Sequence, residues 1–184
     1  PAYAIGFEAP RTLHLVGSWP LQTAVRRPGD MDVDVEAVMP STLFQEKDTL
    51  NARYFTKRAF YLAVLAAHLR QEKQDVSYAF VGGDRRRACV VLRPKALSKL
   101  RAVVRIHLAH EPGLFPVARL APDRNNLRGA AVGASEQDTH ALPPTPMYNT
   151  CIAADSLRLA HLVYLNATSE MCAGSVSYTH LRAH

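Results

Sequence analysis

A chain of 184 residues, 48% of them hydrophobic, can form one core and is too short for two domains of ordinary size. Its three cysteines show no C-x-x-C spacing and no even count, which argues against a disulfide-rich secreted protein. The net charge of +6 favours polyanion partners, although it is moderate for this length and a solvated basic surface is the plainer explanation. No apolar run approaches the roughly 20 residues that span a bilayer.

Alternating apolar and polar residues predict the first two strands. Residues 12–17, TLHLVG, alternate well enough for a strand, and residues 31–39, MDVDVEAVM, alternate strictly. Between them, PLQTAV fits a short helix or turn, which the turn signal RRPGD ends.

A long helix is predicted next. Thr42 and Gln45 have capping-box spacing, and the helical pattern continues through about Leu69. Apolar residues at helical spacing mark its buried face: Leu50, Tyr54, Tyr61, Leu62, Leu65 and Leu69. On this pattern, Arg53, Lys57 and Arg58 lie off the buried face.

The second half begins with a predicted hairpin, in which apolar residues 76–81 are followed by Gly-Gly-Asp, a basic triplet and ACVVL. Residues 102–110 form a further strand, residues 129–141 resemble a flexible insertion, and residues 151–165 have helical periodicity. The order predicts a mixed α/β or α+β fold with one sheet covered by helices.

The strand at residues 31–39 carries a candidate metal site. Asp32 and Asp34 lie at positions i and i+2, so their carboxylates project from one face, about 7 Å apart along the strand. Such carboxylates could share Mg²⁺ ions that clamp a triphosphate during in-line phosphoryl transfer. A stripe from Asp30 to Glu36 that faces solvent explains the same alternation.

Gly17 and Ser18 are the second part of the candidate site, a turn that could hold phosphate groups. A Gly-Ser turn that opens a helix can offer backbone N–H groups to phosphates. The sequence contains the pattern h-G-S, then thirteen residues, then D-h-D-h, where h is a hydrophobic residue. This pattern resembles the signature of the polymerase-β-like nucleotidyltransferase superfamily. That resemblance implies a mixed sheet flanked by helices, with Gly17 and Ser18 at the triphosphate and Asp32 and Asp34 as metal ligands.

The superfamily's active members need a third carboxylate on a neighbouring strand. In chain order that strand is VVRIHLAHE, where the pattern puts an aspartate at or near His107. Histidine is a poor Mg²⁺ ligand, and Arg105 beside it repels a cation. Glu36, two residues beyond Asp34, is expected to point away from the gap. These residues predict an incomplete site.

Longer strings narrow the resemblance. HLVGSWPLQT, DVDVEAVMPSTLFQEKDTLNARYFTKRAFYLAVLAAHL, RIHLAHEPGLFPVARLAPDRNNLR and TPMYNT together closely resemble the first domain of the nucleolar RNA-associated protein family, Nrap. The resemblance runs from about residue 11 to 165. It implies a domain of a much longer chain that has lost catalysis and serves in the nucleolus, in the small-subunit processome that matures pre-18S ribosomal RNA. The expected partners are pre-ribosomal RNA and processome proteins, with no cofactor and no membrane partner.

This resemblance divides the chain into three parts. Residues 11–150 are expected to form the nucleotidyltransferase-like domain, and residues 151–174 to begin a following helical region. Residues 175–184 look like translated adaptor sequence, so we expect a non-native tail. The first residue, Pro1, suggests a fragment.

Five basic residues are candidate RNA contacts. Arg53 and Lys57 lie on the predicted long helix, where solvated or paired charges are the plainer interpretation. Arg85, Arg86 and Arg87 follow the hairpin turn, where exposed charge is ordinary, and a protruding basic tip can equally contact an RNA backbone.

Two other functions stay open. One is an active template-independent RNA nucleotidyltransferase that uses Mg²⁺ and a nucleoside triphosphate, with Asp32 and Asp34 as metal ligands. The other is a protein-docking module of a large assembly, which an exposed apolar patch would favour.

Overall fold

The computed structural model describes residues 6–23, 31–127 and 146–171. Five strands form one mixed sheet: β1 Thr12–Val16, β2 Met31–Val38, β3 Asp75–Phe80, β4 Ala88–Arg93 and β5 Ala102–Ala109. Their order across the sheet is β1-β2-β5-β4-β3. Among these strands, β2 and β5 pair in parallel and the other neighbours pair antiparallel. The α+β fold with a mixed sheet, the predicted strands and the hairpin are confirmed.

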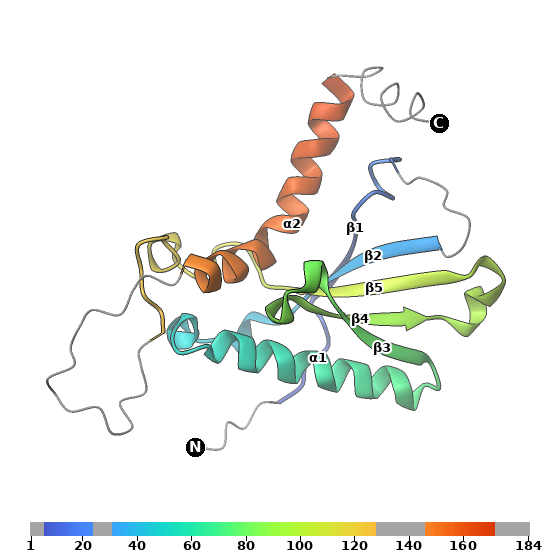
Figure 1. Ribbon diagram of the computed structural model, residues 1–184, viewed down its shortest axis with the longest axis horizontal. Helices are drawn as coiled ribbons and strands as arrows, with labels where there is room; N and C mark the ends of the chain where they lie inside the picture. The colour runs from blue at the N-terminus through green and yellow to red at the C-terminus, as the bar shows by residue number, and fades with distance from the viewer. Residues whose placement is uncertain (1–5, 24–30, 128–145, 172–184) are drawn as a thin grey trace, which may run out of the picture.

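Two α-helices flank the sheet, α1 Arg53–Gln71 and α2 Pro146–Met171. Figure 1 shows α1 running along one side of the sheet while α2 leads away from it near β1. Six short 3-10 turns join the described elements: η1 Ser41–Leu43, η2 Glu46–Thr49, η3 Val81–Gly83, η4 Arg85–Arg87, η5 Lys95–Leu100 and η6 Val117–Arg119.

The core lies between α1 and the sheet face that carries Ala37, Val90 and Leu108. Alternation explains this, because successive strand residues point to opposite faces. The aromatic residues of α1, Tyr54 and Tyr61, are almost fully buried against that face. The core cluster comprises Ala37, Met39, Phe44, Tyr54, Tyr61, Leu62, Ala66, Val90, Leu108, Phe115 and Ile152.

The predicted start of the long helix is wrong. Residues 41–49 form two 3-10 turns, and α1 begins only at Arg53, because Asn51 and Ala52 have positive φ angles of 55° and 58° that interrupt a right-handed helix. The capping box lies one turn later than predicted, where the Gln45 backbone N–H donates to Asp48 Oδ2 at 2.7 Å.

The placement of Lys57 and Arg58 off the buried face is also wrong, since both are buried. Lys57 Nζ donates to Asp48 Oδ2 at 2.7 Å and to the Leu43 carbonyl at 2.8 Å. Both ammonium contacts satisfy a charge that would otherwise be costly to bury.

Arg58 joins the two helices. Its Nε donates to Asp155 Oδ2 on α2 at 2.8 Å, and its Nη1 donates to the Ala88 carbonyl at 3.0 Å. The Tyr54 hydroxyl donates to the same Asp155 oxygen at 2.8 Å, and burial is the main reason that the pKa of Tyr54 is raised well above its ordinary value. Asp155 therefore fixes α2 to α1.

The helix predicted at residues 151–165 begins earlier, at Pro146, and ends later, at Met171. Ile152 lies in the core, and Asn149 bonds the loop before it through the carbonyls of Ala121 and Arg124. At the other end, Phe7 packs on Tyr61 with ring centroids 5.0 Å apart. The described core thus includes residues on both sides of the expected 11–150 boundaries, while the division into domains remains a prediction. The predicted insertion at 129–141 and the tail at 175–184 lie outside the described residues.

Candidate functional site

The candidate site is a row of carboxylates on β2, and the neighbouring strand β5 determines its surroundings. In the parallel pairing, Asp34 lies beside Arg105 and Glu36 lies beside His107. Residues paired in this way share a face, opposite to the face that packs on α1. The row Asp32, Asp34 and Glu36 therefore meets two basic side chains of β5.

Each carboxylate of the row has a basic partner. Asp32 Oδ1 lies 3.1 Å from Arg105 Nη2, and Asp34 Oδ1 lies 2.8 Å from His107 Nε2. Glu36 Oε2 lies 3.4 Å from Nη1 of Arg158, on α2. All three acidic groups thus contact a basic side chain of the same chain.

The three carboxylates differ in how much of each side chain is exposed to solvent. The Asp32 side chain is 43% exposed and the Asp34 side chain 31%, whereas Glu36 is buried. A solvent-facing stripe therefore describes Asp32 and is wrong for Glu36, because α2 passes over Glu36 and supplies Arg158. Asp30 lies outside the described residues. Arg158 was missed, although charged Asp155 and Arg158 interrupt an otherwise apolar helical run, which is a signal for buried pairs.

The electrostatic environment differs along the row. The hydrogen bond with His107 is the main reason that the pKa of Asp34 is lowered, although desolvation opposes it. Burial raises the pKa of Glu36, and Arg158 partly offsets this. Asp34 is thus held as a carboxylate that already has a partner.

Gly17 and Ser18 lie at a turn beside this row. Residues 17–22 form turns, which is one of the two structures predicted for PLQTAV, and no helix opens behind Gly-Ser in the described residues before β2. Trp19 Nε1 donates to the Asp32 carbonyl at 2.8 Å and the Thr23 backbone N–H donates to the Ser18 carbonyl at 3.0 Å. The indole therefore fastens the turn to β2, and Ser18 itself is exposed.

Gly17 is required in this turn for two reasons. Its φ is +79°, a region that L side chains rarely adopt, and a Cβ there would lie 2.9 Å from Asp34 Oδ2. The turn thus closes directly over the carboxylate of Asp34.

Gly17→Ala is expected to lower the free energy of unfolding by about 2–3 kcal/mol, since φ strain of about 1–2 kcal/mol is joined by the clash with Asp34. Gly82→Ala is the matched control, because Gly82 has φ +62° and a Cβ there would enter open space. Its loss is expected to be about 1 kcal/mol. Urea unfolding of both variants measures the difference, and equal losses would show that the approach to Asp34 is unimportant.

A two-metal site does not fit these residues. Mg²⁺ prefers oxygen ligands, yet the group in contact with Asp34 is the imidazole of His107, and Arg105 presents a fixed positive charge. The described residues contain no group of three or more His, Cys, Asp or Glu side chains arranged to hold a metal ion. The placement of His107 against Asp34 agrees with the position expected from the sequence.

The RNA-contact candidates fall in three environments. Arg53 opens α1 and is half-buried, and Lys57 is buried on Asp48, so its ammonium is not presented to a ligand. Arg85 is exposed, and Arg87 is half-buried. Arg86 forms a bidentate pair with Asp84 at 2.9 Å for both bonds, and its guanidinium lies 5.4 Å from the Tyr148 ring centroid. Their contact with RNA remains a prediction.

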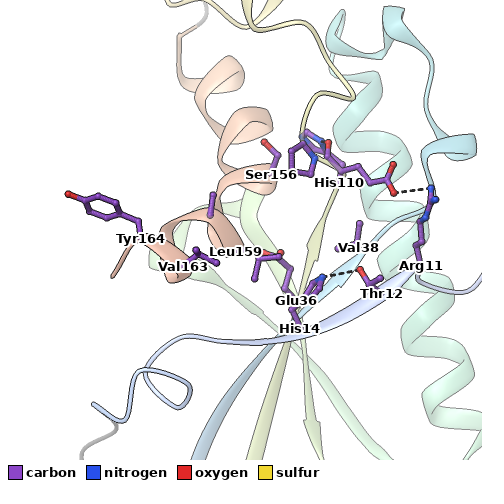
Figure 2. Close-up of a pocket in the computed structure, with 13 residues that line it drawn as sticks. Arg11, Thr12, His14, Glu36, Val38, His110, Ser156, Leu159, Val163 and Tyr164 are labelled. Atoms are coloured by element: carbon purple, nitrogen blue, oxygen red, sulfur yellow. Dashed lines mark hydrogen bonds and ion pairs between the residues drawn. The ribbon is translucent and has the colours of Figure 1, made fainter. Parts of the chain in front are cut away.

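A cleft of about 620 Å³ lies between β1 and α2. Figure 2 shows Thr12 and His14 of β1 on one side and Ser156, Leu159 and Val163 of α2 on the other. Its surface is mostly apolar, with Glu36 at the bottom. Within the described parts of the chain, no helix has the length and apolar character needed to cross a membrane.

Comparison with known proteins places these features in a family. The family model described as Nrap protein domain 1 matches residues 1–171. The chain is 38% identical over 164 residues to Nucleolar protein 6 of Homo sapiens and 35% identical over 163 residues to Nucleolar protein 6 of Xenopus laevis. These matches cover 87% and 86% of this chain and 14% of each relative.

A fungal relative matches as well. The chain is 29% identical over 195 residues to U3 small nucleolar RNA-associated protein 22 of Saccharomyces cerevisiae, which covers 96% of this chain and 15% of that protein. The chain therefore spans about one seventh of the length of these relatives. Since the family model covers almost all of it, the chain belongs to the Nrap protein family.

Proposed function

We propose that this chain is a non-catalytic, RNA-associated domain of a nucleolar protein that serves in ribosome biogenesis. The names of the relatives, Nucleolar protein 6 and U3 small nucleolar RNA-associated protein 22, support the nucleolar location and the association with RNA. The finer proposal is membership of the small-subunit processome and a part in pre-18S ribosomal RNA processing. Its partners are then pre-ribosomal RNA and processome proteins.

The observation that carries the non-catalytic part is the internal pairing of Asp34 with His107. Phosphoryl transfer needs metal ions that bind between the carboxylates and the phosphate. Here Arg105 and His107 contact the carboxylates of Asp32 and Asp34, where such ions would bind. The Gly-Ser turn between β1 and β2 and the carboxylate row on β2 keep part of the layout expected of a nucleotidyltransferase, although no helix follows Gly-Ser in the described residues before β2. We therefore interpret the domain as a degenerate nucleotidyltransferase.

The test is nucleotide incorporation into a short RNA primer by the full 184-residue chain with Mg²⁺ or Mn²⁺. We expect no incorporation by protein that melts cooperatively, and no change in its melting temperature on addition of about 10 mM Mg²⁺. Metal-dependent incorporation that Asp34→Asn abolishes would contradict the proposal and establish an enzyme.

A designed variant serves as the positive control for metal binding. Arg105→Ser with His107→Asp removes the basic partners of Asp32 and Asp34 and adds a third carboxylate beside these two, whose mutual repulsion a cation relieves. For this variant we expect about 10 mM Mg²⁺ to raise the melting temperature by about 2–4 °C. A wild-type protein that gains as much would show that Arg105 and His107 do not exclude the metal.

A second candidate function is the docking of protein partners in a large assembly. The cleft between β1 and α2 favours it, together with exposed apolar side chains on α2: Leu157, Val163, Tyr164 and Leu165. Loss of processome-protein binding in Val163→Ser with Tyr164→Ser, while RNA affinity and melting temperature stay unchanged, would distinguish this function from RNA contact.

A further inference from the structure

One stretch of the chain, residues 85–110, has basic side chains but no acidic ones. Residues 85–110 contain no aspartate and no glutamate, although the whole chain has 16 acidic residues. The same stretch has eight lysine and arginine residues: Arg85, Arg86, Arg87, Arg93, Lys95, Lys99, Arg101 and Arg105. A local excess of positive charge on this scale attracts polyanions.

The structure separates these bases into two ends of the sheet. Arg85, Arg86 and Arg87 precede β4, whereas Arg93, Lys95 and Lys99 lie at its other end or in η5, between β4 and β5. Figure 1 shows this connection at the end of the sheet away from α2. Arg93 is the last residue of β4, and Lys95 and Lys99 lie in η5, so these three bases fall within residues 93–99 of one short connection.

Arg93, Lys95 and Lys99 group three exposed bases at one end of β4, whereas among Arg85, Arg86 and Arg87 at its other end only Arg85 is exposed. All three are exposed, and no carboxylate of the described residues lies within ion-pair distance of them. Arg86 and Arg105, by contrast, are paired with Asp84 and Asp32. We refer to Arg93, Lys95 and Lys99 as the connector patch.

The composition of the stretch indicates which part of a nucleic acid fits. Residues 85–110 contain no phenylalanine, tyrosine or tryptophan, the side chains on which unpaired bases stack. Lysine ammonium groups act as point charges that suit phosphate oxygens without reading the sequence. This composition therefore suits contact with the phosphate backbone rather than with the bases.

We propose that the connector patch binds the phosphate backbone of RNA without base specificity. The inference deepens the proposed function and depends on its RNA association. It moves the contact surface away from Lys57, which is buried, and away from Arg86, which is paired with Asp84. The patch lies on the connection between β4 and β5, the strand that carries Arg105 into the carboxylate row.

The test is fluorescence anisotropy of a labelled RNA of about 20 nucleotides with the full chain over a range of salt concentrations. Lys95→Gln with Lys99→Gln removes two phosphate contacts. The slope of log affinity against log salt is expected to fall by about 1.4, and the affinity at about 0.1 M salt by up to about 25-fold. Changing the RNA sequence at constant length is expected to leave the affinity within about twofold.

The matched control is Lys47→Gln with Arg11→Gln. Lys47 lies in η2 and Arg11 lies just before β1, so both are exposed bases away from the patch, and this variant has the same net charge as the patch variant. Its RNA affinity is expected to change by less than about twofold, and both variants should keep the wild-type melting temperature. The difference between the two variants then reports position rather than total charge.

Three outcomes would overturn the proposal in different ways. Equal weakening by the two variants would show that net charge alone determines binding, while the RNA association of the proposed function stands. Equal affinity of the wild type for polyglutamate of the same charge, lost in the patch variant, would identify an acidic protein as the partner. No RNA binding by folded wild type would overturn the RNA association itself.

Discussion

Asp155→Ala is expected to lower the free energy of unfolding by about 3–5 kcal/mol, because it leaves the guanidinium of Arg58 buried without its counter-ion. The Arg58 side chain is 4% exposed and the Asp155 side chain 3%, so water cannot replace the lost contact. The Tyr54 hydroxyl loses its acceptor at the same time. Urea unfolding measures the change.

Two further variants separate the causes. Arg58→Met with Asp155→Leu removes both charges and is expected to recover most of the loss, since buried pairs can often be replaced by apolar residues. Glu46→Ala breaks the pair between Glu46 and Arg119, whose side chains are 59% and 42% exposed, and is expected to cost less than about 1 kcal/mol. A loss below about 1 kcal/mol for Asp155→Ala would show that the two helices are not fixed by this pair.

A chain that ends at residue 145 is expected not to unfold cooperatively. Removing α2 takes Ile152 from the core, at about 2–5 kcal/mol for a large aliphatic side chain, and leaves Arg58 without Asp155. Together these losses approach the stability of about 5–15 kcal/mol that is typical of a whole domain. Circular dichroism during heating is the measurement.

A chain that ends at residue 165 is the control. It keeps Asn149, Ile152, Asp155 and Arg158, and the side chains at its new end, Tyr164 and Leu165, are exposed. Its free energy of unfolding is expected to stay within about 1 kcal/mol of the full chain. A cooperative melt of the shorter chain near the wild-type temperature would support a domain that ends at residue 150, as the sequence predicts.

Most of the elements that are predicted correctly from the sequence follow from local residue patterns. The strict alternation of MDVDVEAVM predicts β2, and the Gly-Gly-Asp turn between two apolar runs predicts the hairpin of β3 and β4. The beginning of α1 could not be predicted in this way, since it depends on positive φ angles at Asn51 and Ala52, residues that do not demand them.

Long-range pairing limits what the sequence shows of the site. Asp34 and His107 are 73 residues apart, and only the resemblance to a superfamily signature indicated that they meet. Arg58 and Asp155 are 97 residues apart, with no such signature, so the sequence left open whether the charge of Arg58 is solvated or paired. The spacing of arginine and lysine residues in a helix is the same whether their charges face water or pair with a distant carboxylate. The local pattern therefore does not distinguish the two cases.

The parallel pairing of β2 with β5 has a consequence for the order of assembly during folding. Its partners, such as Met31 and Ala102, are about 70 residues apart in sequence, and closing so long a loop has an entropic cost that must be met before the strands pair. The hairpin and α1 need only local contacts and are expected to form first. The pairs of Asp32 with Arg105 and of Asp34 with His107, which require both strands, then form only once β2 and β5 have met.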